Sequence, residues 1–245
     1  MVFVRVGGLL AIFPIFAAQH FPVRVRLALG AGIAFLISPS LPTIDVGQWS
    51  VFRLAGQLAL ETCIGLLLGF VSRMTFYALE FTGGIISMEM GLNLSGSFNP
   101  FNRDRSEAMG LIVYYLGAML VLTLNLHHWL LIGFQKSYAL LPVGGAHLGP
   151  ALFSDVVGRT SQIFLIGLLM AAPLMAVSFL ISLVFSVLGR AVPQMNVFSE
   201  SFAFRVLGGL AVFGMTVNLM AQHIVNYLRR LPEDLLRVAQ FLGAT

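Results

Sequence analysis

Charged residues are scarce in this chain. Only 10% of its 245 residues are Asp, Glu, Lys or Arg, whereas 58% are hydrophobic, and the mean hydropathy is +0.92. Soluble globular domains carry about 25% charged residues. The composition therefore excludes an ordinary soluble domain and indicates an integral membrane protein.

Lysine is almost absent, since Lys136 is the only one and the other 13 of the 14 basic residues are arginines. The arginines stand singly or in pairs at the ends of apolar runs and form no basic block. Nucleic-acid binding requires a clustered basic face, so this function is excluded. We interpret the isolated arginines as anchors at a membrane interface.

Cysteine occurs once, at Cys63, which excludes an intrachain disulfide and is interpreted as a small buried hydrophobe. The histidines show no metal-ligand spacing such as His-Glu-x-x-His, and His127 and His128 are adjacent, which points them about 100° apart on a helix. With Trp129 they resemble an aromatic belt at a membrane interface. We expect no enzyme, cofactor or metal site, with an intramembrane enzyme as an alternative.

Apolar residues are abundant and fall into runs at 2–19, 27–41, 54–72, 74–94, 108–134, 162–188 and 202–228. A membrane span needs about 20 mostly apolar residues. The last three runs meet that length, and the first is interpreted as a retained span. The second is stopped short by Pro39 and Pro42, and the run at 74–94 is weakened by its charges.

Glycine and proline are frequent inside these runs, with 25 and 10 copies. Gly65 and Gly69 have the spacing that lets two helix backbones approach closely, and Pro173 predicts a kink. The connecting segments carry similar, small numbers of positive charges, so the positive-inside rule selects no orientation. We therefore expect bent helices, some of them buried in an assembly.

The C-terminal segment 233–242 has the pattern of a short amphipathic helix. Pro232 suits the first helical turn, and Glu233 and Asp234 lie near the positive end of the helix dipole. The predicted apolar face consists of Leu235, Leu236, Ala239 and Leu242.

Four charged residues inside the apolar runs are the first candidates for a functional site, because charge in hydrocarbon is costly. They are Glu61, Arg73, Glu80 and Glu89. One interpretation is an ion or proton relay in a small secondary transporter. The other is polar packing between helices, which we favour because the halves of the chain show no repeat.

The segment 90–110 interrupts the apolar pattern with small residues, asparagines, a proline and a knot of charges. Its glycine and serines allow a compact, bendable backbone, and its phenylalanines could seal a narrow lumen. The residues alone favour an ordinary solvated loop over a channel plug. The candidate plug residues are Asn93, Ser95, Gly96, Ser97, Phe98, Asn99, Pro100 and Phe101.

Several motifs occur in a fixed order along the chain. The opening run from Phe3 to Phe16 is FVRVGGLLAIFPIF, the segment from Asn125 to Leu131 is NLHHWLL, and Leu188 to Phe198 is LGRAVPQMNVF. In this order and spacing the chain resembles the FliR/SctT family of flagellar and type III secretion export-gate proteins, and it is most similar to the flagellar branch.

The resemblance implies an all-α, polytopic membrane protein with kinked, glycine-rich helices, forming a single export-gate domain over residues 1–245. It implies a non-enzymatic part in a channel for unfolded flagellar substrates, in the bacterial inner membrane and the flagellar basal body. The implied partners are FliP and FliQ homologues and a FlhB homologue. It also favours a plug at 93–107 over the solvated loop. A virulence-type (injectisome) secretion gate is the alternative within the family.

Overall fold

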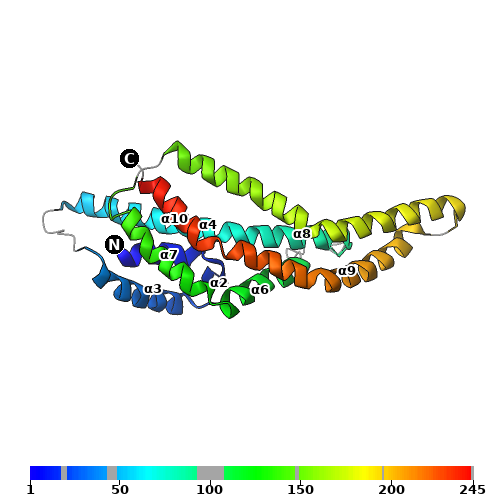
Figure 1. The fold of residues 1–245 in the computed structure, drawn as a ribbon, viewed down its shortest axis with the longest axis horizontal. Coiled ribbons are helices and arrows are strands. Elements are labelled where there is room, and N and C mark those ends of the chain that lie inside the picture. Colours follow the sequence, from blue (N-terminus) through cyan, green and yellow to red (C-terminus); the bar gives the residue numbers. More distant parts are fainter. Residues whose placement is uncertain (18–20, 43–48, 93–107, 147–148, 195, 244–245) are drawn as a thin grey trace. The chain divides into compact units, whose positions relative to one another are not determined.

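The computed structural model describes residues 1–17, 21–42, 49–92, 108–146, 149–194 and 196–243. Within these ranges every regular element is helical, which confirms the predicted all-α fold (Figure 1). The elements are α1 (Val2–Ile12), α2 (Pro14–Ala17), α3 (Val23–Ile37), the 3-10 helix η1 (Ser38–Ser40), α4 (Val51–Glu89), α6 (Ala108–Thr123), α7 (Leu126–Leu140), α8 (Pro150–Ala191), α9 (Val197–Leu228) and α10 (Leu231–Gly243).

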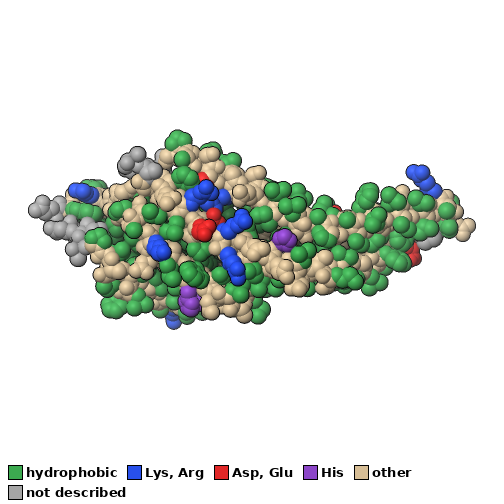
Figure 2. Space-filling model, in the orientation of Figure 1, with side chains coloured by type: hydrophobic (Ala, Val, Ile, Leu, Met, Phe, Trp, Pro, Cys, Tyr) green, Lys and Arg blue, Asp and Glu red, His purple; other side chains and the backbone are tan. Residues whose placement is uncertain are grey.

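Helices of membrane-spanning length and hydropathy confirm the polytopic membrane class. In the described part of the chain four helical segments qualify, within Val23–Ser40, Val51–Glu89, Pro150–Ala191 and Ser199–Gly243. A fifth span results if the bent pair α6 and α7 is counted as one. Figure 2 shows hydrophobic side chains over much of the visible surface, as expected where lipid or another protein replaces water.

The prediction of separate runs at 54–72 and 74–94 is wrong, because α4 is one continuous helix of 39 residues. Arg73 and Glu80 interrupt the hydropathy profile but not the helix. Both residue types have high helix propensity, and no proline lies between Val51 and Glu89. Hydropathy alone therefore predicts a helix boundary near Arg73, where the helix in fact continues.

The first run does not form the predicted single span. Helix α1 ends at Ile12 after 11 residues, and Phe13 takes an extended conformation with ψ 127°. A residue before proline is restricted to such conformations, and Pro14 then opens α2. In contrast, the second run is longer than predicted, because its helix begins at Val23 and qualifies as a span.

The run at 108–134 is also divided. Helices α6 and α7 meet at an angle of 75°, and Asn125 between them has a left-handed backbone with φ 54°. Asparagine tolerates that conformation better than most residues. Helix α8, by comparison, continues as one element through Pro173.

The predicted amphipathic C-terminal helix is confirmed as α10. Its buried face differs slightly from the prediction, since Leu236 is partly exposed and Val238 is buried instead. The buried residues of α10 are Leu231, Leu235, Val238, Ala239 and Leu242.

The chain consists of two compact units, each held together mainly by contacts among its own residues. Unit 1 comprises Met1–Thr75, Val121–Thr160 and Leu228–Thr245, and unit 2 comprises Phe76–Leu120 and Ser161–Tyr227. In unit 1, α10 packs along α7 and α1 packs along α3 (Figure 1). Unit 2 has its own buried core, which includes Phe76, Leu79, Ile86, Val113 and Leu174.

Candidate functional site: a buried ion pair and an apolar cavity

Arg5 of α1 and Glu61 of α4 form a fully buried ion pair in unit 1. The Arg5 Nε donates to Glu61 Oε2 at 2.5 Å, and Nη2 donates to Oε1 at 2.9 Å. Neither side chain has any exposed surface. Two parallel N–H donors match the two carboxylate oxygens. The pair therefore fixes the position of α1 along α4 as well as the distance between the two helices.

The same two side chains also hold the end of α7 and the chain that follows it. Arg5 Nη1 donates to the Leu141 carbonyl at 3.1 Å, and the Gly144 N–H donates to Glu61 Oε1 at 3.4 Å. The guanidinium lies over the Tyr138 ring, 4.1 Å from its centroid. These contacts partly replace the water that both charges have lost.

Glycines allow the α1 and α4 backbones to touch beside this pair. A Cβ at Gly65 would overlap the Arg5 carbonyl oxygen, and one at Gly69 would lie 2.8 Å from the Leu9 carbonyl oxygen. On the opposite helix, a Cβ at Gly8 would lie 2.9 Å from the Leu66 nitrogen. The spacing of Gly65 and Gly69 therefore serves a close helix crossing, as the sequence suggested.

The other three predicted polar residues do not join Glu61. Arg73 lies 12 positions further along α4, which is about 18 Å of helix, and Glu80 and Glu89 belong to unit 2. All three are partly buried. Of the four predicted residues, only Glu61 thus takes part in the ion pair, and polar packing by the others stays a prediction.

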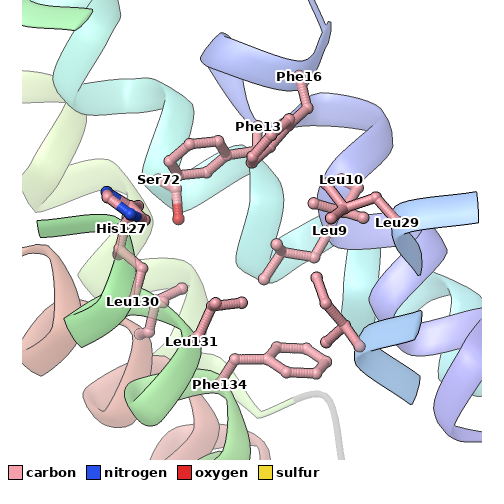
Figure 3. A pocket seen from close by; sticks show the side chains of 12 residues that line it. Leu9, Leu10, Phe13, Phe16, Leu29, Ser72, His127, Leu130, Leu131 and Phe134 are labelled. Carbon is pink, nitrogen blue, oxygen red and sulfur yellow. The ribbon is translucent and has the colours of Figure 1, made fainter. Parts of the chain in front are cut away.

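An apolar cavity of about 210 Å³ lies one helical turn from the ion pair in unit 1 (Figure 3). On α1, Leu9 follows Arg5 by one turn, and on α7, Phe134 precedes Tyr138 by one turn and contacts its ring. The cavity is lined by Leu9, Leu10, Phe13, Phe16, Leu29, Ile33, Ser72, His127, Leu130, Leu131, Phe134 and Leu235.

His127 and Ser72 are the polar residues on the cavity wall, and both are labelled in Figure 3. The His127 Nδ1 is shielded from solvent and has no hydrogen-bond partner among the described residues. Its neighbours His128 and Trp129 are exposed, as an interfacial belt requires. His127 thus departs from that prediction, because the start of α7 turns it inward.

A second polar cluster joins the start of α8 to α10 within unit 1. Arg159 Nε contacts Asp155 at 2.6 Å, and Arg159 Nη1 contacts Asp234 of α10 at 2.7 Å. Figure 2 shows acidic and basic side chains gathered over α10. The spacing of Asp155 and Arg159 was visible in the sequence, whereas the pairing with Asp234 required the tertiary structure.

Sequence reasoning missed Arg5 as a site residue. The signal available was a lone arginine inside an apolar run, two positions before the glycine pair Gly7-Gly8. The interpretation of Cys63 as buried is wrong, since this residue is exposed. The candidate plug, Asn93 to Phe101, lies outside the described residues, so its role stays a prediction.

The sequence also matches a family model over residues 1–231, whose description is "Bacterial export proteins, family 1". The chain belongs to this family. The matched residues include the ion pair and every residue of the cavity wall except Leu235. The predicted family resemblance is thereby confirmed.

Several curated proteins of known name are similar over most of their length. The flagellar biosynthetic protein FliR of Escherichia coli (strain K12) is 32% identical over 236 residues, covering 95% of this chain and 90% of that protein. FliR of Caulobacter vibrioides is 28% identical over 232 residues, covering 94% and 92%. FliR of Bacillus subtilis (strain 168) is 28% identical over 212 residues, covering 84% and 80%.

Proposed function

We propose that this protein is a non-enzymatic subunit of the flagellar protein export gate in the bacterial inner membrane. It would help to form the channel through which unfolded flagellar substrates cross that membrane. The observation that carries the proposal is the family match over residues 1–231, together with similarity to flagellar FliR proteins over most of the chain. These relatives favour the flagellar system over a virulence-type secretion gate.

The distribution of apolar surface supports a subunit of a larger assembly. Large side chains are highly exposed on several helices, among them Phe35 (78%), Phe52 (90%) and Met215 (83%). In the most apolar window of Ser199–Gly243, only 6% of the residues are buried within the chain. Bent helices and polar groups at membrane depth are tolerated where protein surrounds them. The proposed neighbours are FliP and FliQ homologues, with a FlhB homologue at the entrance.

The buried ion pair supports a structural role for Glu61. Both carboxylate oxygens are engaged, by two nitrogens of Arg5 and by the Gly144 backbone. A carboxylate that carries protons through a transporter has to release such partners in each cycle. We therefore propose that Glu61 holds the gate subunit together.

Deletion of the gene, followed by complementation, tests the function. We expect the deletion strain to lose motility and export of flagellar substrates, and the wild-type chain to restore both and to co-purify with FliP and FliQ homologues. A protein that is monodisperse alone and moves a small solute across liposomes would instead support the transporter alternative. Loss of virulence-type secretion with normal motility would support the injectisome alternative.

The plug hypothesis for residues 93–107 has its own test. Removing the six residues from Gly96 to Phe101 should leave assembly intact and make the gate leak ions, measured as loss of membrane potential in assembled mutants. The matched control removes six residues from another connecting segment, Thr43 to Gln48, and should not leak. Wild-type ion retention in an assembled Gly96–Phe101 deletion refutes the plug.

A further inference from the structure

The apolar cavity of unit 1 is enclosed mainly by the interior of the fold (Figure 3). Seven of the 12 residues on its wall are buried, namely Leu9, Leu10, Phe13, Ser72, Leu130, Phe134 and Leu235. A groove that receives a helix of another protein is instead an exposed apolar surface. The cavity therefore suits a thin group that enters the fold.

The wall offers water almost nothing to bind, because carbon forms nearly all of the surface that faces the cavity. The Ser72 hydroxyl already donates to the Leu68 carbonyl at 2.9 Å. A buried water needs roughly two to four polar partners, and a cavity of about 150 Å³ lined by Leu, Ile and Phe stays dry. A dry, empty space forgoes the dispersion contacts of its lining. An apolar occupant restores them.

The volume of about 210 Å³ sets the size of that occupant. Since a dry cavity of about 150 Å³ accommodates benzene, this one accommodates roughly eight carbon atoms in proportion. The end of a long hydrocarbon chain supplies such a segment, while the rest of the chain continues outside the fold.

The cavity is not sealed, and its opening lies beside apolar surface. The wall residues that are at least partly exposed are Phe16 of α2, Leu29 and Ile33 of α3, and His127 and Leu131 of α7. Helix α3 belongs to a candidate membrane span of which only 17% is buried within the chain. In a membrane, hydrocarbon is the solvent of such a surface, so acyl chains are available at the opening.

We propose that the cavity binds the terminal segment of a phospholipid acyl chain, which enters between α3 and α7 and leaves the ester and the headgroup outside the fold. The lipid site goes beyond the proposed function, because it requires only a membrane protein. An acyl chain leaves other acyl chains when it binds, so the hydrophobic effect contributes little. The favourable free energy comes from filling a space that is otherwise empty.

Photo-labelling of the full chain tests the site. The purified protein is reconstituted in vesicles of phosphatidylethanolamine and phosphatidylglycerol with a trace of phosphatidylethanolamine that carries a diazirine at the end of one acyl chain. We expect adducts on Leu10 and Phe134, which lipid around the protein cannot reach because they are 1% and 2% exposed. Phe35, 78% exposed on α3, reports labelling by that surrounding lipid. Adducts on exposed residues alone overturn the inference.

Filling the opening should exclude the chain. Leu131→Trp should lower the labelling of Leu10 and Phe134 about fivefold or more, because close-packed side chains leave no room for it. Ile132→Trp is the matched control, since Ile132 adjoins Leu131 on α7 but lies off the wall, and its labelling should stay within about twofold of wild type. Ile33→Trp closes the opening from α3 and covers a failure of Leu131→Trp to fold. Unchanged labelling in the filled variants overturns the inference.

Two other occupants give different results. The labelling is repeated on the chain purified with co-expressed FliP and FliQ homologues, where the adducts on Leu10 and Phe134 should persist. Their loss would show that a neighbouring subunit fills the cavity and would overturn the inference. Palmitic acid with the same diazirine tests a free fatty acid, and labelling by the acid without labelling by the phospholipid also overturns it. None of these outcomes decides the proposed function, which motility and export test separately.

Discussion

Gly65 of α4 lies directly against the main-chain carbonyl of Arg5 of α1, so closely that a Cβ at Gly65 would overlap the carbonyl oxygen. This backbone contact sits beside the ion pair that Arg5 makes with Glu61. The close backbone contact and the buried ion pair thus lie at the same crossing of α1 and α4. Substitutions at Gly65 and Glu61 therefore test how this crossing contributes to the stability of the protein.

Gly65→Ala should destabilise the protein by about 1–3 kcal/mol, because the added methyl group forces α1 away from α4. The measurement is the thermal unfolding midpoint of the detergent-purified chain. Gly56→Ala on the same helix is the control, since its Cβ would meet nothing within 4 Å. Equal midpoints for the two variants would contradict the close crossing.

Glu61→Gln should cost about 3–5 kcal/mol, because it leaves the buried Arg5 without its counter-charge. The double variant Arg5→Met/Glu61→Leu removes both charges and should recover most of that loss. Thermal unfolding of the purified chain again gives the comparison. A double variant less stable than Glu61→Gln would show that the pair adds net stability.

His127→Phe should raise the stability by about 1 kcal/mol, because it removes from the cavity wall a buried nitrogen that has no hydrogen-bond partner among the described residues. The control is His128→Phe, which alters the exposed neighbour on the same helix and should change little. The test is the shift in unfolding midpoint between the two variants. A destabilised His127→Phe would reveal a hydrogen-bond partner for this ring.

Leu235→Ser should release α10 from α7, at a cost of about 2–5 kcal/mol for a buried leucine. Leu236→Ser, one position along and partly exposed, should have a much smaller effect. Trypsin cleavage after the exposed Arg237 reports the release directly. Cleavage at the same rate in both variants would mean that α10 is not held by this face.

The helices could be anticipated only in part. The membrane class, the all-α fold and the amphipathic α10 follow from hydropathy and helical periodicity, which are local properties of the chain. The sequence predicted a boundary at Arg73, where the helix continues, and predicted none after Ile12, where α1 ends. Charges interrupt hydropathy without breaking a helix, whereas Pro14 breaks a helix without interrupting hydropathy.

The candidate site shows the same division between local and tertiary information. Glu61 was recognisable from its sequence alone, because a carboxylate inside an apolar run needs an explanation. Its partner Arg5, 56 positions away, was not, since only the folded chain brings α1 onto α4. The cavity wall likewise combines residues of α1, α2, α3, α4, α7 and α10.

The sequence by itself determined the membrane class, the helical fold and the export family, because composition, periodicity and ordered motifs are properties of the linear chain. The tertiary structure decided which charges are paired. Ion pairs depend on distances of a few ångströms between segments remote in sequence. Packing therefore satisfied Glu61 inside unit 1, through Arg5 of another helix.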